Sequence, residues 1–160
     1  PILFVELESG QNGTLTPYPG QGVGQTWLGA DGATITLDQG VIKASRGMGD
    51  DVMGSSSSMP KWLQINHKKM TNYIRKVSYI TGNNKLSERL FECTIKKINK
   101  KENIKIWNVE FWITKFEENC SYNNFEITNI YYLDDNEIVR QSNQYHSETL
   151  GYIFTQRLDR

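Results

Sequence analysis

The stretch from Thr26 to Ser58, TWLGADGATITLDQGVIKASRGMGDDVMGSSSS, is where residue types and spacing most suggest chemistry. Glycine-rich loops of this kind cradle phosphate groups in nucleotide-binding proteins. A P-loop also needs a Gly-Lys pair, however, and the sequence contains none. Just upstream, Gly20, Gly22 and Gly24 match part of a dinucleotide fingerprint, but they precede a predicted strand instead of a helix. We therefore interpret the glycines as turn residues of a β-hairpin.

The segment 49–60, GDDVMGSSSSMP, is compatible with one short helix that ends at Pro60. Gly47 precedes it, and the N-terminus of such a helix could hold an anion. The carboxylates of Asp50 and Asp51 would repel an anion there, because they stand at the start of the segment. An anion site is not expected.

Other catalytic and metal-binding patterns are also missing. The two histidines, His67 and His146, are separated by 78 residues, and neither stands in a zinc-binding spacing. The sequence has no G-x-S-x-G motif of a serine hydrolase. Pairs of acids such as 117–118 could serve glycoside hydrolysis, but neighbouring side chains on a strand point to opposite faces. The stretch DDNE at 134–137 lacks the glycine and the distal glutamate of a calcium loop. We predict no catalytic residue, no metal and no cofactor, and hence no enzyme.

Charge is unevenly distributed along a chain whose formal net charge is zero. Residues 61–115 carry 13 bases and four acids, a net charge of +9, between two acidic flanks. Such a segment could attract an acidic polysaccharide or another polyanion. It is also what solvent-facing lysines on strands would produce, because lysines keep sheet edges soluble. The neutral total charge argues against a nucleic-acid-binding protein.

The pattern of apolar residues predicts a mainly β fold. At 160 residues the chain fits one domain, 1–160, by the usual range of roughly 100–200 residues. Turn residues recur every 8–12 residues or so, which favours an antiparallel β-barrel or half-barrel, with a β-sandwich as the alternative and at most one or two short helices. No apolar run is long enough to span a bilayer. We expect strands near the N-terminus, on both sides of a turn at Asp38–Gly40, and over 90–98, 104–116, 125–133, 138–145 and 151–158.

Two segments of this strand assignment need separate interpretation. The stretch 99–103, NKKEN, reads as a hairpin loop before one long strand over 104–116. The segment 59–81 allows either a helical apolar stripe or a strand, and we interpret it as β structure that begins with an irregular stretch.

Two residue types leave alternatives open. Cys93 and Cys120 could form one disulfide, which would stabilise the fold by about 3–4 kcal/mol, or remain two buried thiols. The four tryptophans and eight tyrosines suit a β core, and one or two of them could be exposed for stacking on sugar rings.

Three sequence blocks together resemble the YjbF/GfcB-type lipoproteins of capsule and exopolysaccharide production. The first block, within 26–53, has a tryptophan before an Ala-Asp-Gly turn and then a Gly-x-Gly-Asp segment; its matching positions are Trp27, Ala30, Asp31, Gly32, Gly40, Arg46, Gly47, Gly49 and Asp50. The other blocks lie in the C-terminal half and supply Cys93, Cys120, Asn129, Tyr131, Ile138, Ser142, Gln144, Gly151 and Tyr152. The resemblance covers about residues 26 to 158 and is weakest at 60–90.

This resemblance implies a secreted protein that faces the periplasm and is anchored by lipid, usually to the outer membrane. The acylated cysteine and the signal peptide would lie upstream of Pro1, and the membrane would be met only through that anchor. The oxidising periplasm implies that Cys93 and Cys120 are joined. The implied role is non-catalytic, with an outer-membrane β-barrel and periplasmic proteins of the same exopolysaccharide system as partners.

Three functions therefore remain as hypotheses. The leading one is an accessory or scaffold lipoprotein of exopolysaccharide export. The alternatives are a direct polysaccharide-binding module, and a half-barrel carrier of lipid or lipoprotein. Trp27, Arg46, Asp50 and Asp51 are the candidate residues of a partner or glycan surface.

Overall fold

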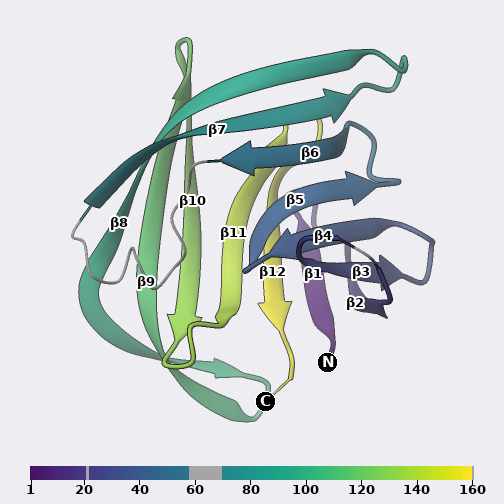
Figure 1. Cartoon of the computed structure of the whole chain (residues 1–160). Helices are drawn as coiled ribbons and strands as arrows, with labels where there is room; N and C mark the ends of the chain where they lie inside the picture. Colours follow the sequence, from purple (N-terminus) through teal and green to yellow (C-terminus); the bar gives the residue numbers. More distant parts are fainter. Residues whose placement is uncertain (21, 58–69, 160) are drawn as a thin grey trace.

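The computed structural model describes residues 1–20, 22–57 and 70–159, and these contain twelve β-strands and no helix (Figure 1). One antiparallel sheet is nearly closed into a barrel with a single open seam. The mainly β, barrel-like prediction is thereby confirmed over the sandwich alternative. The described residues contain no helix that could cross a membrane. The strands are β1 (Leu3–Leu7), β2 (Asn12–Tyr18), β3 (Gln25–Gly29), β4 (Thr34–Asp38), β5 (Val41–Arg46), β6 (Asp51–Ser57), β7 (Met70–Ile80), β8 (Leu86–Ile106), β9 (Val109–Tyr122), β10 (Phe125–Asp134), β11 (Val139–Ser147) and β12 (Gly151–Arg157).

The strand order is β5-β4-β3-β2-β1-β12-β11-β10-β9-β8-β7-β6. In the described part of the chain, consecutive strands pair as hairpins except β5 and β6, which are the two edges of the sheet. In addition β1 pairs with β12, which joins the two ends of the chain within the sheet. The predicted turns at Asp38–Gly40 and at 134–137 are confirmed. In the second turn the Asp134 carboxylate accepts hydrogen bonds from the backbone N–H groups of Asn136 and Ile138, so it closes the turn.

The long strand predicted over 104–116 is wrong. A two-residue turn at Trp107–Asn108 separates β8 from β9, and Trp107 has a left-handed φ of 53°. A tryptophan is uncommon in that conformation, and apolar residues continue on both sides of the turn, so the pattern does not reveal it. The loop predicted at 99–103 lies inside β8, where the ladder with β9 has only a register shift between Lys97 and Lys101.

The short helix predicted over 49–60 is also wrong within the described residues. Residues Asp51–Ser57 form β6, which pairs antiparallel with β7. The serine run has little apolar surface to pack as a helix, whereas it can pair with the exposed edge of β7. The expected helix end at Pro60, His67 and the irregular stretch up to residue 69 lie outside the described residues. From Met70 onward the ambiguous segment is strand, as interpreted.

Two apolar clusters fill the barrel. One lies under β6 to β11 and contains Val52, Tyr73, Phe91, Ile95, Phe116, Tyr131 and Leu133 among its members. The other lies under β1, β3, β4, β5 and β12 and contains Leu3, Trp27, Ile35, Ile42 and Ile153. Burial alternates along the strands, most clearly in β11, because successive side chains point to opposite faces of a sheet.

The open seam lies between β5 and β6, which form no ladder in the described part of the chain. Side chains replace the missing backbone bonds. The Lys43 ammonium donates to the Ser55 carbonyl at 3.0 Å, and Arg46 Nη1 donates to the Val52 carbonyl at 2.8 Å. The Val52 N–H donates to Ser45 Oγ at 2.9 Å. Arg46, a candidate surface residue from the sequence, thus helps to hold the seam.

Gly40, at the turn before β5, shows why this region needs glycine. Its φ is +87°, and an added Cβ would lie 2.4 Å from Val139 Cβ. Both the backbone conformation and the close approach therefore require glycine. The interpretation of the glycine-rich stretch as a turn-forming region agrees with this geometry.

A disulfide joins Cys93 and Cys120, as the family resemblance implied. The two residues are direct partners in the ladder between β8 and β9, and both are buried. The bond closes a loop with a sequence separation of 27 residues. In the chain-entropy model such a loop stabilises the fold by about 3–4 kcal/mol.

Candidate functional site

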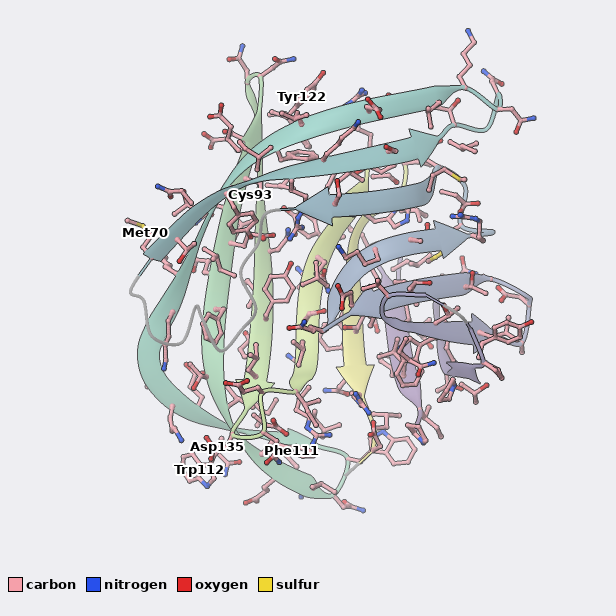
Figure 2. All side chains as sticks on the ribbon, in the orientation of Figure 1. Met70, Cys93, Phe111, Trp112, Tyr122 and Asp135 are labelled. Carbon is pink, nitrogen blue, oxygen red and sulfur yellow. A yellow bond between two sulfur atoms is a disulfide. The ribbon has the colours of Figure 1, made fainter. Side chains whose placement is uncertain are left out.

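A groove at one mouth of the barrel combines aromatic rings with polar groups. It has a volume of about 480 Å³ and lies where β7, β8, β9, β10 and β11 meet the turns between them. Tyr122, at the end of β9, marks this mouth in Figure 2. The groove is lined by Asp50, Tyr79, Thr81, Ser87, Arg89, Phe91, Tyr122, Asn123, Asn124, Phe125, Tyr145, Ser147 and Glu148.

The aromatic rings of the groove are held by contacts with one another. Phe91 and Tyr122 have ring centroids 5.9 Å apart, and those of Phe125 and Tyr145 are 5.5 Å apart. The Arg89 guanidinium lies 5.2 Å from the centre of the Tyr122 ring, in a cation–π contact. Rings fixed in this way are suited to stacking against the apolar faces of sugar rings.

The charges in the groove are more negative than positive. Asp50 and Glu148 contribute carboxylates, and Arg89 contributes the guanidinium, which lies 3.9 Å from Glu148. Asp50 accepts a hydrogen bond from the Thr149 hydroxyl. Burial, and then the nearby charge of Glu148, raise the pKa of Tyr145 to about 12, so its hydroxyl stays neutral. The groove is therefore better suited to a neutral, hydroxyl-rich ligand than to an acidic one.

The structure separates the four surface candidates. Trp27 is only 3% exposed and packs in the core of the N-terminal strands, so it offers no ring face to a ligand. Arg46 bonds across the seam. The carboxylate of Asp51 accepts hydrogen bonds from the backbone N–H groups of Gly47 and Met48, which closes the turn before β6. Asp50 is the candidate that lines the groove.

Sequence reasoning missed the residues that surround Asp50. Arg89, Tyr122, Phe125 and Tyr145 come from four strands, β8 to β11, that meet only in the folded barrel. The high aromatic content was the available signal, because it indicated that some rings would be exposed. It could not identify which rings share one mouth.

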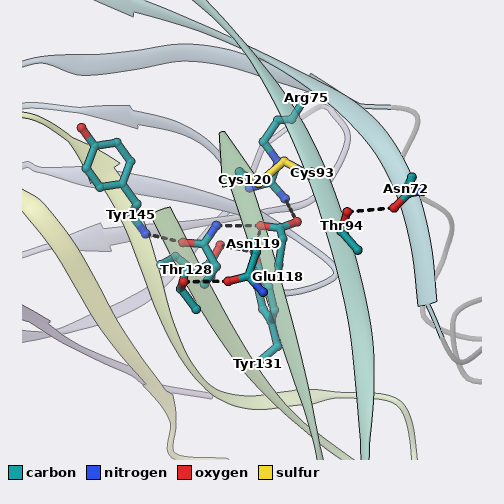
Figure 3. Close-up of a disulfide and its surroundings, with 12 residues drawn as sticks. Asn72, Arg75, Cys93, Thr94, Glu118, Asn119, Cys120, Thr128, Tyr131 and Tyr145 are labelled. Carbon is teal, nitrogen blue, oxygen red and sulfur yellow. Dashed lines mark hydrogen bonds and ion pairs between the residues drawn. A yellow bond between two sulfur atoms is a disulfide. The ribbon is translucent and has the colours of Figure 1, made fainter. Parts of the chain in front are cut away.

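An ion pair lies inside the barrel, beside the disulfide (Figure 3). Arg75 Nη2 on β7 lies 2.7 Å from Glu118 Oε2 on β9, and both side chains are buried. Asn129 Nδ2 donates to the other carboxylate oxygen at 2.6 Å, and the Tyr131 hydroxyl donates to it at 3.3 Å. Burial raises the pKa of Glu118 to about 7, while these two hydrogen bonds act to lower it. The polar partners thus offset part of the effect of losing water around the carboxylate.

Gln144 on β11 continues the polar interior toward the seam. Its amide nitrogen donates to the Gly40 carbonyl at 2.7 Å and to Ser142 Oγ at 2.8 Å. Its carbonyl oxygen accepts from the Ile42 N–H at 3.0 Å and lies 3.4 Å from the Tyr131 hydroxyl oxygen. The side chain therefore satisfies backbone groups of β5, on the far side of the barrel interior.

A serine–histidine contact is the arrangement that most resembles a catalytic one. Ser45 Oγ lies 2.8 Å from His146 Nε2, and His146 Nδ1 lies 3.0 Å from Ser147 Oγ. The Tyr79 hydroxyl donates to the His146 carbonyl at 2.8 Å. Ser45 and His146 are each 1% exposed, and Ser45 Oγ also accepts from the Val52 N–H. The group is sealed from solvent and joins β5, β6 and β11, so it acts as a structural fastening of the seam.

One group of potential metal ligands occurs among the described residues: Cys93, Glu118 and Cys120. Metal binding by cysteine requires thiolates, and here both sulfurs are used in the disulfide. The Glu118 carboxylate already has three protein partners. The group is therefore part of the buried framework.

Fold and site together define a β-barrel protein whose interior polar groups support the fold and whose open groove lies at one mouth. The chain belongs to the YjbF family: the family model described as "Group 4 capsule polysaccharide lipoprotein gfcB, YjbF" matches residues 1–158. The resemblance noted in the sequence is thereby confirmed. Membership identifies a capsule-related lipoprotein and implies a lipid-anchored protein associated with the cell envelope.

The fold also matches a solved structure, the hypothetical lipoprotein YmcC from Escherichia coli (K12). The TM-score is 0.88 at 16% sequence identity, and the match covers 99% of this chain and 83% of that one. At this identity the likeness establishes the shared fold. A comparison with curated proteins finds no match.

The buried histidine makes a prediction about pH. Burial lowers the pKa of His146 from 6.5 to about 4, although Asp51 and Asp50 act to raise it. The folded protein then binds fewer protons than the unfolded chain, so this contribution to stability is complete above about pH 6.5 and is lost as the pH falls toward about 4. The loss amounts to about 3 kcal/mol. Urea unfolding at neutral and acidic pH should show a smaller pH-dependent loss for His146→Gln than for the unmodified chain.

His67 is present in both proteins of this comparison and so cancels from the difference. Equal losses of stability for the two proteins between neutral pH and about pH 4 would contradict the buried, neutral state of His146.

Proposed function

We propose that this chain is a non-catalytic accessory protein of capsule or exopolysaccharide export, anchored by lipid at the periplasmic face of the outer membrane. There it binds an outer-membrane β-barrel and periplasmic proteins of the same system. The family match supports the link to capsule polysaccharide. Its role in this proposal is to hold components of the export system together.

The proposal rests on the observation that the reactive side chains inside the barrel bond to one another. Arg75 and Glu118 pair with each other, and His146 is enclosed by Ser45, Ser147 and the seam. A catalytic group must reach its substrate, and these groups are buried among their own partners. Function is therefore assigned to the surface of the barrel.

The filled interior also bears on the carrier hypothesis. A carrier of lipid needs an apolar cavity large enough for an acyl chain. The two apolar clusters and the polar side chains between them lie inside the barrel. The proposal therefore favours a binding surface over transport of a cargo inside the barrel.

A second candidate function, direct binding of polysaccharide, is favoured by the groove at the mouth. Its fixed aromatic rings, asparagines and hydroxyl groups are the side chains that recognise sugars. With two carboxylates and one guanidinium, it fits a neutral stretch of glycan. Binding of a neutral glycan in the groove differs from the attraction of an acidic polysaccharide to the basic segment 61–115.

Crosslinking in the producing cells tests the accessory role. A photo-reactive amino acid at Asn123 or Asn124, on the rim of the groove, should capture envelope proteins that act in polysaccharide export. The same probe at Val23, which is exposed elsewhere on the barrel, serves as the matched control. The captured proteins are identified by mass spectrometry.

Deletion of the gene should also lower the amount of surface polysaccharide. Unchanged polysaccharide together with capture of proteins unrelated to export would contradict the accessory role. Cleavage of capsular polysaccharide by the purified chain would contradict its non-catalytic part.

Calorimetric titration with neutral oligosaccharides from the capsule tests the groove. Tyr122→Ala removes the ring that stacks under Arg89, and it should weaken binding by about fivefold or more, because stacking contributes about 1 kcal/mol or above. Tyr18→Ala removes an exposed tyrosine outside the groove and should bind like the unmodified chain. Equal weakening by both variants, or no binding by the unmodified chain, would contradict glycan binding in the groove.

A further inference from the structure

The opposite end of the barrel carries a two-stranded ribbon with two exposed tryptophans. Beyond its ladder with β10, which ends at Ile113, β9 pairs only with β8, from the pair Asn103–Trp112 to the turn at Trp107–Asn108. Trp107, in the turn, is 70% exposed, and Trp112, on β9, is 59% exposed. Large exposed apolar side chains that cluster in this way mark contact sites for proteins or membranes. The two exposed rings therefore indicate a contact surface for a partner.

The two faces of the ribbon differ in character. One face turns toward the barrel: Ile106 and Ile113 are buried, and the Phe111 ring lies 4.5 Å below the Arg140 guanidinium. The ladder places Lys101, Asn103, Lys105 and Glu110 on the other face together with Trp112. The ribbon thus covers this end of the barrel with its apolar face and presents tryptophan and lysine outward. In Figure 2, Trp112 points away from the barrel at the lower end.

Both chain termini lie at this same end (Figure 1). Arg140, which contacts Phe111 of the ribbon, donates through Nη1 to the Asp159 carbonyl at 2.7 Å. The Leu158 N–H donates to the Ile2 carbonyl at 2.8 Å. These contacts connect the ribbon to the C-terminus and then to the N-terminus. A lipid attached to a segment upstream of Pro1 would therefore reach the membrane from the end that bears the tryptophans.

We propose that the outer face of the ribbon 101–114 contacts a membrane surface, with Trp107 and Trp112 at the level of the headgroups and the lysines on anionic phosphates. Tryptophan is enriched at membrane–water interfaces because its ring is apolar and its N–H is polar. The ribbon 101–114 holds two lysines and two glutamates; its outer face presents Lys101, which also pairs with Asp135 at 2.6 Å, and the exposed Lys105, which can meet the phosphates of an anionic leaflet. The orientation of the membrane relative to the N-terminus rests on the proposed lipid anchoring; the affinity of the ribbon for lipid does not.

A membrane fits this surface better than a polysaccharide does. Sugars bind in concave sites that surround several of their hydroxyl groups. The ribbon is the outermost element at its end of the barrel (Figure 1). Trp107, in the turn at its tip, is largely exposed. A protruding tip of this kind can insert its rings into a flat lipid surface without a matching cavity. The aromatic groove at the other mouth, by contrast, is concave.

Co-flotation of the unlipidated chain with vesicles tests the proposal. Vesicles of phosphatidylglycerol and phosphatidylcholine in equal amounts should bind the chain, and vesicles of phosphatidylcholine alone should bind it more weakly. The double variant Trp107→Ala/Trp112→Ala should bind the mixed vesicles at least about tenfold more weakly. Lys105→Gln should weaken binding about fivefold, and added salt should reduce that difference.

The matched control is Leu86→Ala/Leu90→Ala, which removes two exposed apolar side chains, 66% and 55% exposed, from the far part of the same strand β8. It should bind vesicles like the unmodified chain. All of these positions are exposed, so the variants should keep the urea midpoint of the unmodified chain. If the leucine control variant lost as much binding as the tryptophan variant, the binding would be non-specific adsorption, and the proposal would be overturned.

Two further outcomes would also overturn it: no binding of the unmodified chain to the mixed vesicles, or tryptophan-dependent binding to an acidic polysaccharide such as alginate without binding to vesicles. Because the assay contains only the chain and lipid, its failure leaves the proposed role in polysaccharide export intact. Crosslinking in cells tests that role separately.

Discussion

The ion pair between Arg75 and Glu118 is the constraint on which the interior of this barrel depends. A charged carboxylate away from water is costly unless opposite charge and hydrogen-bond donors surround it. Here β7 supplies the guanidinium and β10 supplies Asn129 and Tyr131, so the charge on β9 is satisfied only when all three strands are in register. From Tyr131 the contacts pass to Gln144 on β11 and on to the backbone of β5. The network thus links walls of the barrel that have no ladder in common.

This network explains how a sheet with an open seam keeps its shape. Edge strands expose unpaired backbone groups, and β5 and β6 are the two edges of the sheet. Ser45, Lys43 and Arg46 satisfy backbone groups of β6, and His146 holds Ser45 from inside. These polar side chains bond within the seam, whereas the two ends of the barrel are open to partners. One end has an aromatic groove with excess negative charge, and the other has a two-stranded ribbon with exposed tryptophans.

Much of the fold could be predicted from local signals. Turn residues and alternating apolar residues indicated an antiparallel barrel, and the hairpin around 134–137 is where the sequence placed it. The errors arose where local signals are silent: Trp107 takes a left-handed conformation that favours other residues, and the serines of β6 form a strand because β7 offers an edge. The site was harder to predict, since Asp50, Arg89 and Tyr145 meet only after the sheet has curled. Trp27, a surface candidate from the sequence, is buried. Its burial depends on the neighbouring strands that pack over it, and the residues next to it in the sequence do not reveal it.

The central claim is that the buried polar groups hold the barrel together and do not act on a substrate. A double-mutant cycle on the unfolding free energy, with Arg75→Met and Glu118→Gln, tests it most directly. Each single variant should lose about 3–5 kcal/mol, because it leaves one buried partner uncompensated, and the double variant should lose clearly less than the sum of the two. Losses that simply add, or single variants as stable as the unmodified chain, would contradict the account.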